Sequence, residues 1–355
     1  MKTQGVFSTW LSKPPAVLPA LLGALWLLFG CQPADSDRAS DTTAGDRPEG
    51  WPETFRIGVF AGDDVIGTAE QQKILSNYIS EQIGIPVRLN AGTTYTTVIE
   101  AMRAKRVEAM AVGPFAHCFA QREAGAEALV ARVLSEDEPA VFNEKYKPYY
   151  FSWIITKKGS GIRTLQDLKG KNFSFVDPAS TSGHLFPKSS LIKAGLNPEN
   201  DLKSVFAGTH AGSVLSVWNG KVDAGACFGM PLWQLHSQGH VKFNPFPDGR
   251  IDAPRTAEEI AAQYEDAEDG DLVIIAQSAP IPRTPMAVRS DIPGSLKSAV
   301  RKALSEVKKH PELVRELKRW YVDPTEVIEL ESADAFYDPV REVAKLLGLD
   351  LSSIE

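Results

Sequence analysis

Short apolar runs alternate with amphipathic segments along most of the chain. The runs have the length of buried strands, and the segments between them repeat apolar residues every three or four positions, as one face of a helix does. The strands expected in the first part are 55–60, 86–90, 107–112 and 129–134. The helices expected between them are 69–82, a helix that turns Tyr95, Val98, Ile99 and Met102 inward, and a helix after Gly113-Pro114 that carries His117 and Cys118. This order predicts a mostly parallel sheet covered by helices.

The same alternation starts again after an extended stretch at 146–156. The elements expected there are helices at 164–168, 185–196 and 211–219 and strands at 173–176, 203–206 and 222–226, followed by extended segments at 272–276 and 286–289 and a helical tail at 293–349. The restart predicts an α/β protein with two lobes, 53–147 plus 280–355 and 148–279. Extended hinge crossings at 146–156 and 276–288 would join the lobes and leave a cleft between them,.

The first 31 residues have the layout of an export signal. Lys2 and Lys13 precede an apolar run at 16–28, and Leu28-Phe29-Gly30-Cys31 follows it,. This ending resembles the lipobox of bacterial lipoproteins, in which the cysteine is lipidated, although Phe29 replaces the usual small or branched residue. Plain cleavage with an incidental Cys31 remains the alternative. Residues 32–52 are rich in Asp, Ser, Thr, Gly and Pro, which is typical of a flexible tether,.

Composition narrows the classes of partner. The chain has 355 residues, 43% of them hydrophobic, and a formal net charge of −7. This charge argues against nucleic acid and against anionic lipid surfaces as partners, so contact with a membrane is expected only through the N-terminal lipid. The segment 248–271 has nine acidic residues against two arginines and is expected to be a solvated excursion with one short helix. Cys118 and Cys227 would form either one disulfide or two buried thiols.

A hydroxyl-rich turn follows the strand at 173–176. It reads Asp177-Pro178-Ala179-Ser180-Thr181-Ser182-Gly183-His184 and leads into an expected helix. The first N–H groups of a helix have no partner within it, and the helix dipole favours negative charge at that end. The turn therefore suits an anion, while a simple helix cap by Ser180 or Ser182 is the structural alternative.

In motif order, the chain resembles the PhnD-type family, the substrate-binding components of phosphonate and phosphite ABC importers. The resemblance covers roughly residues 55–347. Its motifs are Tyr95-Thr96-Thr97-Val98-Ile99-Glu100-Ala101-Met102, Gly113-Pro114, Tyr150, the turn at 177–184, Thr209-His210, Asn219-Gly220-Lys221-Val222-Asp223-Ala224-Gly225 and Phe336-Tyr337-Asp338-Pro339-Val340-Arg341. It implies a periplasmic-binding-protein fold, an exported lipoprotein that faces the periplasm or another extracytoplasmic space, and permease and ATPase subunits as partners.

The resemblance also implies roles for individual residues. The hydroxyls of Ser180, Thr181 and Ser182 and nearby backbone N–H groups, such as that of Gly183, would hold the phosphonate or phosphite oxygens. His210 would donate a further hydrogen bond, and Tyr95 and Tyr150 would close over the ligand.

Two departures from the family pattern bear on the ligand. Met230 stands where relatives that bind aminoalkyl phosphonates place a carboxylate, and Thr284 stands where the family usually has an Asp, in Ile281-Pro282-Arg283-Thr284-Pro285. Without these carboxylates we expect a ligand without an amine, such as phosphite or a short alkylphosphonate. Thr284 and Arg283 are additional candidate ligand contacts, the latter through a charge-assisted bond.

Other functions remain alternatives. The same fold would suit another anion, such as phosphate or sulfate, or a sensor of a signalling system. A hydrolase built on Ser182, His210 and Asp223 is disfavoured because no Gly-x-Ser-x-Gly elbow is present, so no enzyme activity is expected,. His236 and His240 have the spacing of a metal pair but lack further ligands nearby, so neither a metal nor a cofactor is expected.

Overall fold

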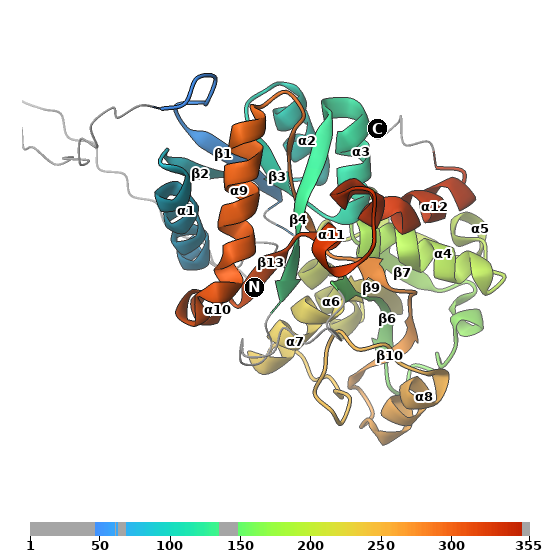
Figure 1. The fold of residues 1–355 in the computed structure, drawn as a ribbon. Helices are drawn as coiled ribbons and strands as arrows, with labels where there is room; N and C mark the ends of the chain where they lie inside the picture. Colours follow the sequence, from blue (N-terminus) through green and yellow to red (C-terminus); the bar gives the residue numbers. More distant parts are fainter. Residues whose placement is uncertain (1–46, 61, 63–68, 135–147, 350–355) are drawn as a thin grey trace, which may run out of the picture. The chain divides into compact units, whose positions relative to one another are not determined.

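The computed structural model describes residues 47–60, 62, 69–134 and 148–349. Arg47–Glu355 make up one compact unit, and two large sheets with their helices account for most of it (Figure 1). The expected export signal, Cys31 and most of the expected tether lie outside the described residues. Within the described ranges, every helix is too short or too polar to cross a bilayer.

The first sheet has six strands. In spatial order these are β13 (Arg319–Val322), β4 (Ala126–Leu134), β12 (Pro285–Arg289), β3 (Ala109–Ala111), β1 (Phe55–Phe60) and β2 (Val87–Gly92). Strands β2, β1 and β3 pair in parallel, whereas β12 is antiparallel to both β3 and β4, and β13 is antiparallel to β4.

The second sheet has five strands. In spatial order these are β10 (Leu272–Gln277), β6 (Ser152–Lys157), β9 (Ala224–Phe228), β7 (Asn172–Phe175) and β8 (Lys203–Phe206). Strands β9, β7 and β8 pair in parallel, and β6 is antiparallel to both of its neighbours.

The expectation of mostly parallel sheets needs correction, because both sheets are mixed. The antiparallel strands in their interiors, β6 and β12, are the ones that the chain forms as it enters from the other sheet. An apolar run indicates that a strand is buried on both faces, but it does not indicate the direction in which the strand runs.

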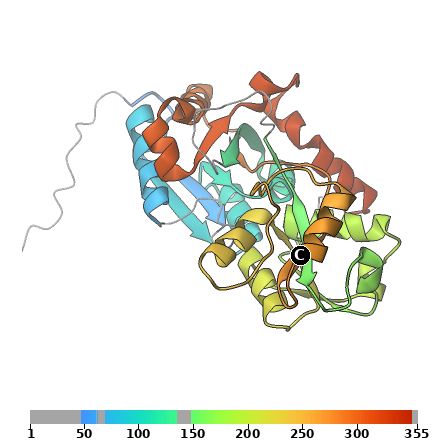
Figure 2. The same cartoon turned by 90° about the horizontal axis from the view of Figure 1, so that it is seen from below.

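Helices cover both faces of the first sheet. Helices α1 (Ala69–Ile83) and α9 (Gly294–Glu306) pack together on one side, and α2 (Tyr95–Arg103) and α3 (Pro114–Ala124) on the other (Figures 1 and 2). The remaining elements of the C-terminal tail are η3 (Val307–Lys309), α10 (Pro311–Leu317), α11 (Pro324–Val327), η4 (Ala333–Tyr337) and α12 (Asp338–Leu346). The inward face predicted for α2 is confirmed, since Tyr95, Val98, Ile99 and Met102 are all buried.

The second sheet has its own helices and a core on each face. The helical elements are η1 (Leu165–Leu168), a π-helical turn η2 (Thr181–Leu185), α4 (Phe186–Lys193), α5 (Pro198–Asp201), α6 (His210–Trp218), α7 (Gly229–Ser237) and α8 (Ala257–Asp266). Side chains along β6 alternate between the two cores: Trp153 and Ile155 pack in one and Ile154 in the other. This alternation is the two-residue period of a strand that is buried on both faces.

Two short strands connect the sheets. Strand β5 (Tyr149–Tyr150) precedes β6, and β11 (Ile281–Pro282) precedes β12, so each lies on one of the predicted crossings. They pair antiparallel with Ile281 opposite Tyr150. The crossings therefore run side by side and carry Tyr150, Arg283 and Thr284 to the same place.

Candidate functional site

The hydroxyl-rich turn begins where β7 ends. The expected helix starts earlier than predicted, because a π-helical turn, Thr181–Leu185, precedes α4. In this turn the N–H of Leu185 donates to the carbonyl of Ser180, and the N–H of Val176 donates to the carbonyl of Gly183. Three buried hydroxyls, those of Ser180, Thr181 and Ser182, result from this arrangement.

The three hydroxyls have different surroundings. Ser180 Oγ accepts from the Gly183 N–H at 3.0 Å, so Ser180 caps the turn as the structural alternative proposed,. Thr181 Oγ1 accepts from the Phe115 N–H at 2.8 Å. Ser182 is held through its backbone, since its carbonyl accepts from Ser152 Oγ at 2.6 Å. This contact fixes the backbone at Ser182 and does not involve the Ser182 hydroxyl.

Gly183 allows the turn to pack closely. A Cβ at this position would come within 2.4 Å of two carbons of Val176. Its N–H donates to Ser180, so the structure gives Gly183 a role in shaping the turn and does not place it on the cavity wall.

A small cavity lies between the turn and the crossings. About 10 Å³ of it is open to the centre of a water molecule, which is close to the least that one water needs. Its lining residues come from both sheets and from the crossings: Tyr95, Gly113, Arg132, Tyr150, Ser180, Thr181, Ser182, Phe228, Arg283 and Thr284. The structure thus brings together Tyr95, Tyr150, the three hydroxyls, Arg283 and Thr284, all of which the sequence proposed.

Two tyrosines contribute polar and aromatic surface to this cavity. Tyr95 is the first residue of α2, and its ring lies 4.4 Å from that of Phe60. Tyr150 meets Phe228 edge to face, with ring centroids 5.9 Å apart. Both rings are therefore fixed by aromatic neighbours while their residues line the cavity.

His210 lies behind the cavity wall. It is the first residue of α6, and its Nε2 is 3.5 Å from Ser180 Oγ. Its ring meets that of Phe228 edge to face at 4.7 Å. Burial lowers the pKa of His210 to about 3, so the imidazole is neutral at physiological pH,. His210 contacts Ser180 but is not among the residues that line the cavity.

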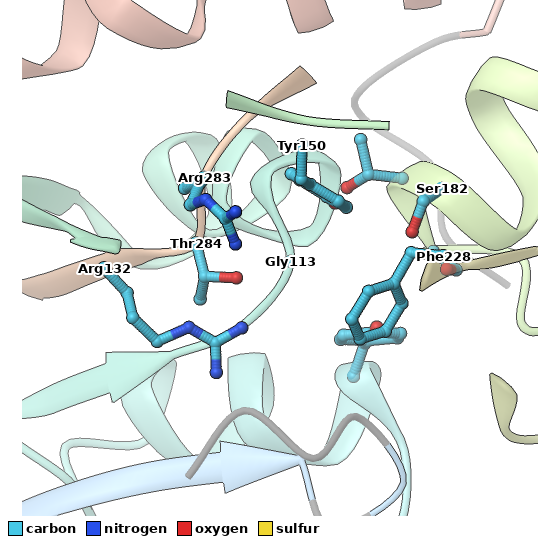
Figure 3. A pocket seen from close by; sticks show the side chains of 10 residues that line it. Gly113, Arg132, Tyr150, Ser182, Phe228, Arg283 and Thr284 are labelled. Atoms are coloured by element: carbon cyan, nitrogen blue, oxygen red, sulfur yellow. The ribbon is translucent and has the colours of Figure 1, made fainter. Parts of the chain in front are cut away.

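The opposite wall of the cavity is cationic. Figure 3 shows Arg132 and Arg283 on one side and Ser182 and Phe228 on the other. The backbone N–H of Arg132 donates to the carbonyl of Thr284, and this bond joins β4 to the crossing. The guanidinium of Arg283 is buried and pairs with Asp252, from the acidic segment 248–271. That segment is therefore not wholly a solvated excursion.

Sequence reasoning missed three lining residues as site members: Gly113, Arg132 and Phe228. A signal existed for Arg132, because it is a lone cation within the apolar run of β4. Gly113 lies beside Tyr95 and Thr181, and a Cβ there would come within 3.3 Å of Thr181 Oγ1. Nothing in the sequence distinguished Phe228 from an ordinary core residue.

The hydrolase alternative fails on geometry. Asp223 accepts from the backbone and side chain of Asn172, at the start of β7, whereas Ser180 and Ser182 follow the end of that strand. Ser180, and not Ser182, lies next to His210, at 3.5 Å from its Nε2. The structure therefore does not bring together the three groups that the hydrolase alternative needs.

The remaining candidates are structural. His117 and Cys118 are buried in α3, as expected, and His117 Nε2 lies 3.1 Å from Asp334. Cys118 and Cys227 are both free buried thiols, which decides between the two possibilities that the sequence left open. Met230, in α7, packs against two of the cores. Among the described residues, no group of three His, Cys, Asp or Glu side chains has the arrangement of a metal site.

Several known proteins that resemble this chain are substrate-binding components of transporters. The family described as "ABC transporter, phosphonate, periplasmic substrate-binding protein" matches residues 57–333. The "Phosphate-import protein PhnD" of Mycolicibacterium smegmatis is 31% identical over 201 residues, which cover 54% of this chain and 59% of the relative. The "Probable ABC transporter phosphite binding protein PhnD1" of Prochlorococcus marinus is 22% identical over 202 residues, 55% of this chain and 63% of the relative. The chain thus spans about three fifths of the length of these relatives.

The fold has a counterpart among solved structures. The structure of PhnD1 from Prochlorococcus marinus in complex with methylphosphonate matches with a TM-score of 0.61 and 14% identity, over 84% of this chain and 99% of that one. At this identity the match establishes the fold, which is the two-lobed α/β fold of periplasmic binding proteins.

Proposed function

Because the chain belongs to the family of periplasmic substrate-binding proteins of phosphonate ABC transporters, we propose that its cavity captures a small phosphorus oxyanion without an amine. Phosphite and short alkylphosphonates are the ligands of this kind. The protein carries the ion to the permease and ATPase subunits of an importer and does no chemistry on it.

One observation supports this ligand class above all. Hydroxyls and guanidinium groups line the cavity, and none of its described lining residues carries a carboxylate. Hydroxyls and guanidinium groups suit oxyanion oxygens. An ammonium group would find no ion-pair partner on these walls and would lie near Arg132 and Arg283. Aminoalkyl phosphonates are therefore the poorest fit.

The residues that line the cavity, and two residues behind its wall, have different roles in binding. Ser182, Thr181 and Ser180 face the oxyanion from the second sheet, and Tyr95 and Tyr150 cover it from α2 and the crossing. Thr284 and Arg283 complete the opposite wall. His210 supports Ser180 from behind, and Gly183 shapes the turn.

The proposal also covers the movement of the two lobes and the location of the protein. Residues 53–147 plus 280–355 and residues 148–279 act as two lobes that close on the ligand about the paired crossings. The export signal is removed and Cys31 carries a lipid, so the protein faces the periplasm or another extracytoplasmic space. Mass spectrometry of the protein from membranes tests the lipid, and unmodified Cys31 in an intact N-terminus would refute it.

Calorimetric titration tests the ligand. The panel is phosphite, methylphosphonate, 2-aminoethylphosphonate, phosphate and sulfate, each titrated into the purified protein at one pH and ionic strength. We expect binding of phosphite or methylphosphonate to exceed that of 2-aminoethylphosphonate by at least about tenfold, the effect of one unfavourable ionic contact. Preference for the aminophosphonate, or no binding of any phosphorus oxyanion, would contradict the proposal.

Phosphate is the second candidate ligand. It is favoured by the similarity to the phosphate-import protein of Mycolicibacterium smegmatis, and it has the size and charge that the hydroxyls and guanidinium groups would accept. The same titration separates the candidates, since phosphate binding tighter than that of phosphite and methylphosphonate would favour this second assignment.

A further inference from the structure

The charge on the cavity walls is one-sided. Arg132, on β4, and Arg283, after β11, both line the cavity, and neither Asp nor Glu is among the described lining residues. Thr284, at the position where the resemblance led us to expect an Asp, has its hydroxyl between the two guanidinium groups in Figure 3. The cavity therefore offers many donors and only weak acceptors.

Arg283 is fixed in place. Its Nη2 pairs with Asp252, and the two side chains are only 8% and 12% exposed. The backbone N–H of Arg283 donates to the carbonyl of Pro148 at 2.9 Å, and the backbone carbonyl of Arg283 accepts from Tyr337 Oη at 3.1 Å. Both the guanidinium and the backbone are therefore held, so the side chain has little freedom to leave the wall.

The same guanidinium has an unused donor. Arg283 Nε is buried and has no hydrogen-bond partner among the described residues. A buried donor without an acceptor is costly, and on a cavity wall an anionic ligand can satisfy it. Asp252 thus positions Arg283 through Nη2, while the Nε donor of the same guanidinium has no partner among the described residues.

We propose that the site selects its ligand in the fully deprotonated form, a doubly charged ion with three terminal oxygens and no hydroxyl, and that Arg283 and Thr284 determine this selectivity. The proposal rests on the proposed function. A singly protonated ion brings a P–OH donor, which a carboxylate would accept strongly, whereas Thr284 can offer only a hydroxyl oxygen. The two guanidinium groups gain more from the second negative charge.

The doubly charged ions of phosphite and alkylphosphonates meet this requirement. The doubly charged ion of phosphate does not, because it keeps one P–OH group. A sulfonate lacks the hydroxyl but has only one charge. The affinities of phosphite, an alkylphosphonate, phosphate and a sulfonate, four small oxyanions of nearly equal size, should therefore differ according to their charge and their number of hydroxyl groups.

The protein groups near the cavity do not mask the titration of the ligand. The charged and titratable groups that face it, or that contact its lining residues, are Arg132 on β4, Arg283 with Asp252, Tyr95 on α2, Tyr150 on β5, His210 on α6 and Tyr337 on η4, and Asp177 lies at the start of the turn. Burial keeps the pKa of His210 at about 3 and raises that of Tyr337. Burial also raises the pKa of Asp177 above its usual acidic value. Because methanesulfonate does not titrate at pH 6 and above, its profile reports any contribution from Asp177 or another protein group, and the difference between the methylphosphonate and methanesulfonate profiles reports on the ligand.

The dissociation constant of methylphosphonate between pH 6 and 8.5 tests the proposal. The apparent constant scales inversely with the fraction of competent ligand, so we expect it to rise by up to about tenfold per pH unit below the second ionisation of the ligand and to level off above it. Methanesulfonate, which has the same shape and no titration in this range, should bind at least about tenfold more weakly at pH 8.5 and show a flat profile. Equal binding of the two ligands, or a flat profile for methylphosphonate, would overturn the proposal and leave the proposed function intact. Absence of binding by phosphite and methylphosphonate at every pH would overturn both.

Two substitutions test the residues. Thr284→Asp supplies the missing acceptor and a negative charge, so methylphosphonate affinity at pH 8.5 should fall about tenfold or more and the pH dependence should flatten or reverse. Arg283→Gln should weaken the preference for methylphosphonate over methanesulfonate, and the exposed Arg315→Gln serves as its matched control. An unchanged pH profile in Thr284→Asp would contradict the assignment of the residues, even if Arg283→Gln fails to fold.

Discussion

Thr181 accepts a hydrogen bond, 2.8 Å long, from the backbone N–H of Phe115. Thr181 belongs to the turn after β7 in the second sheet, whereas Phe115 lies in the first turn of α3, against the first sheet. Helix α3 has no side-chain cap of its own, because Gly113 occupies the N-cap position. Thr181 thus satisfies a first-turn donor of a helix on the other side of the cavity.

Thr181→Val should therefore destabilise the arrangement in which the two sides of the cavity meet. The substitution keeps the shape of the side chain but removes the acceptor, and a buried donor left unsatisfied costs about 1–3 kcal/mol. We expect weaker methylphosphonate binding and a larger radius of gyration at equal ligand concentration, measured by calorimetry and small-angle scattering. Thr325→Val, on an exposed position of α11, is the control. Wild-type values for both quantities would mean that this bond does not couple the two sides.

Ser180 and Ser182 should separate stability from binding. Ser180 Oγ caps the turn by accepting from the Gly183 N–H, and a lost cap costs about 1 kcal/mol of unfolding free energy,. Ser182 is held through its backbone carbonyl, which an alanine keeps, so Ser182→Ala should cost less stability than Ser180→Ala. It should weaken ligand binding by about 1–3 kcal/mol, the effect of one bond to a charged group.

Urea unfolding and calorimetry on both variants give the comparison. Ser180→Ala should lose both stability and affinity, whereas Ser182→Ala should lose chiefly affinity. If Ser182→Ala were destabilised as much as Ser180→Ala and bound ligand normally, the assignment of the Ser182 hydroxyl to the ligand would be refuted.

The sequence predicted more of the residues that line the cavity than of the strand directions in the sheets. The turn at 177–184 was visible because its hydroxyls follow an apolar run, and the motif order located Tyr95, Tyr150 and His210 along the chain. The cavity wall opposite the turn was harder to predict, because Arg132 and Arg283 are 151 positions apart by their numbers and meet only through the pairing of β4 with the crossing. Strand direction and the pairing of Asp252 with Arg283 depend on tertiary contacts that no local pattern encodes.

Gly183 should be intolerant of a methyl group. A Cβ would lie 2.4 Å from Val176 Cβ, and Val176 is fully buried, so neither partner can move freely. Such overpacking costs about 1–3 kcal/mol. Gly183→Ala should lower the free energy of unfolding by this amount in urea titrations and should also weaken ligand binding, because the hydroxyls on both sides shift with the turn.

The matched control is Gly294→Ala, at the first position of α9. A Cβ there meets nothing within 4 Å, and alanine favours a helix over glycine, so this variant should be as stable as the wild type or slightly more stable. Equal stability of the two alanine variants would show that the turn can relax around the added methyl group.

His210 should make the stability of the protein sensitive to acid. Burial lowers its pKa from 6.5 to about 3, so between these values the unfolded chain binds a proton that the folded protein does not,. The stabilisation is therefore complete above pH 6.5 and declines as the pH falls towards 3. Burial also lowers the pKa of His184, to about 4, and that of His117, so these residues add to the same trend.

His210→Gln removes one of these titrations and keeps a polar side chain next to Ser180. Between pH 7 and 5 the wild type should lose about 2 kcal/mol of unfolding free energy through this histidine alone, since each pH unit below 6.5 contributes about 1.4 kcal/mol. Over the same pH range the loss of unfolding free energy in His210→Gln should be smaller than that of the wild type by about 2 kcal/mol. This difference does not depend on how stable the variant is at pH 7, because only the changes with pH are compared. Urea titrations of both proteins at pH 5, 6 and 7 measure it. Parallel profiles would mean that the imidazole is protonated in the folded state, which would place a charge beside Ser180 and make His210 an additional cation for the oxyanion.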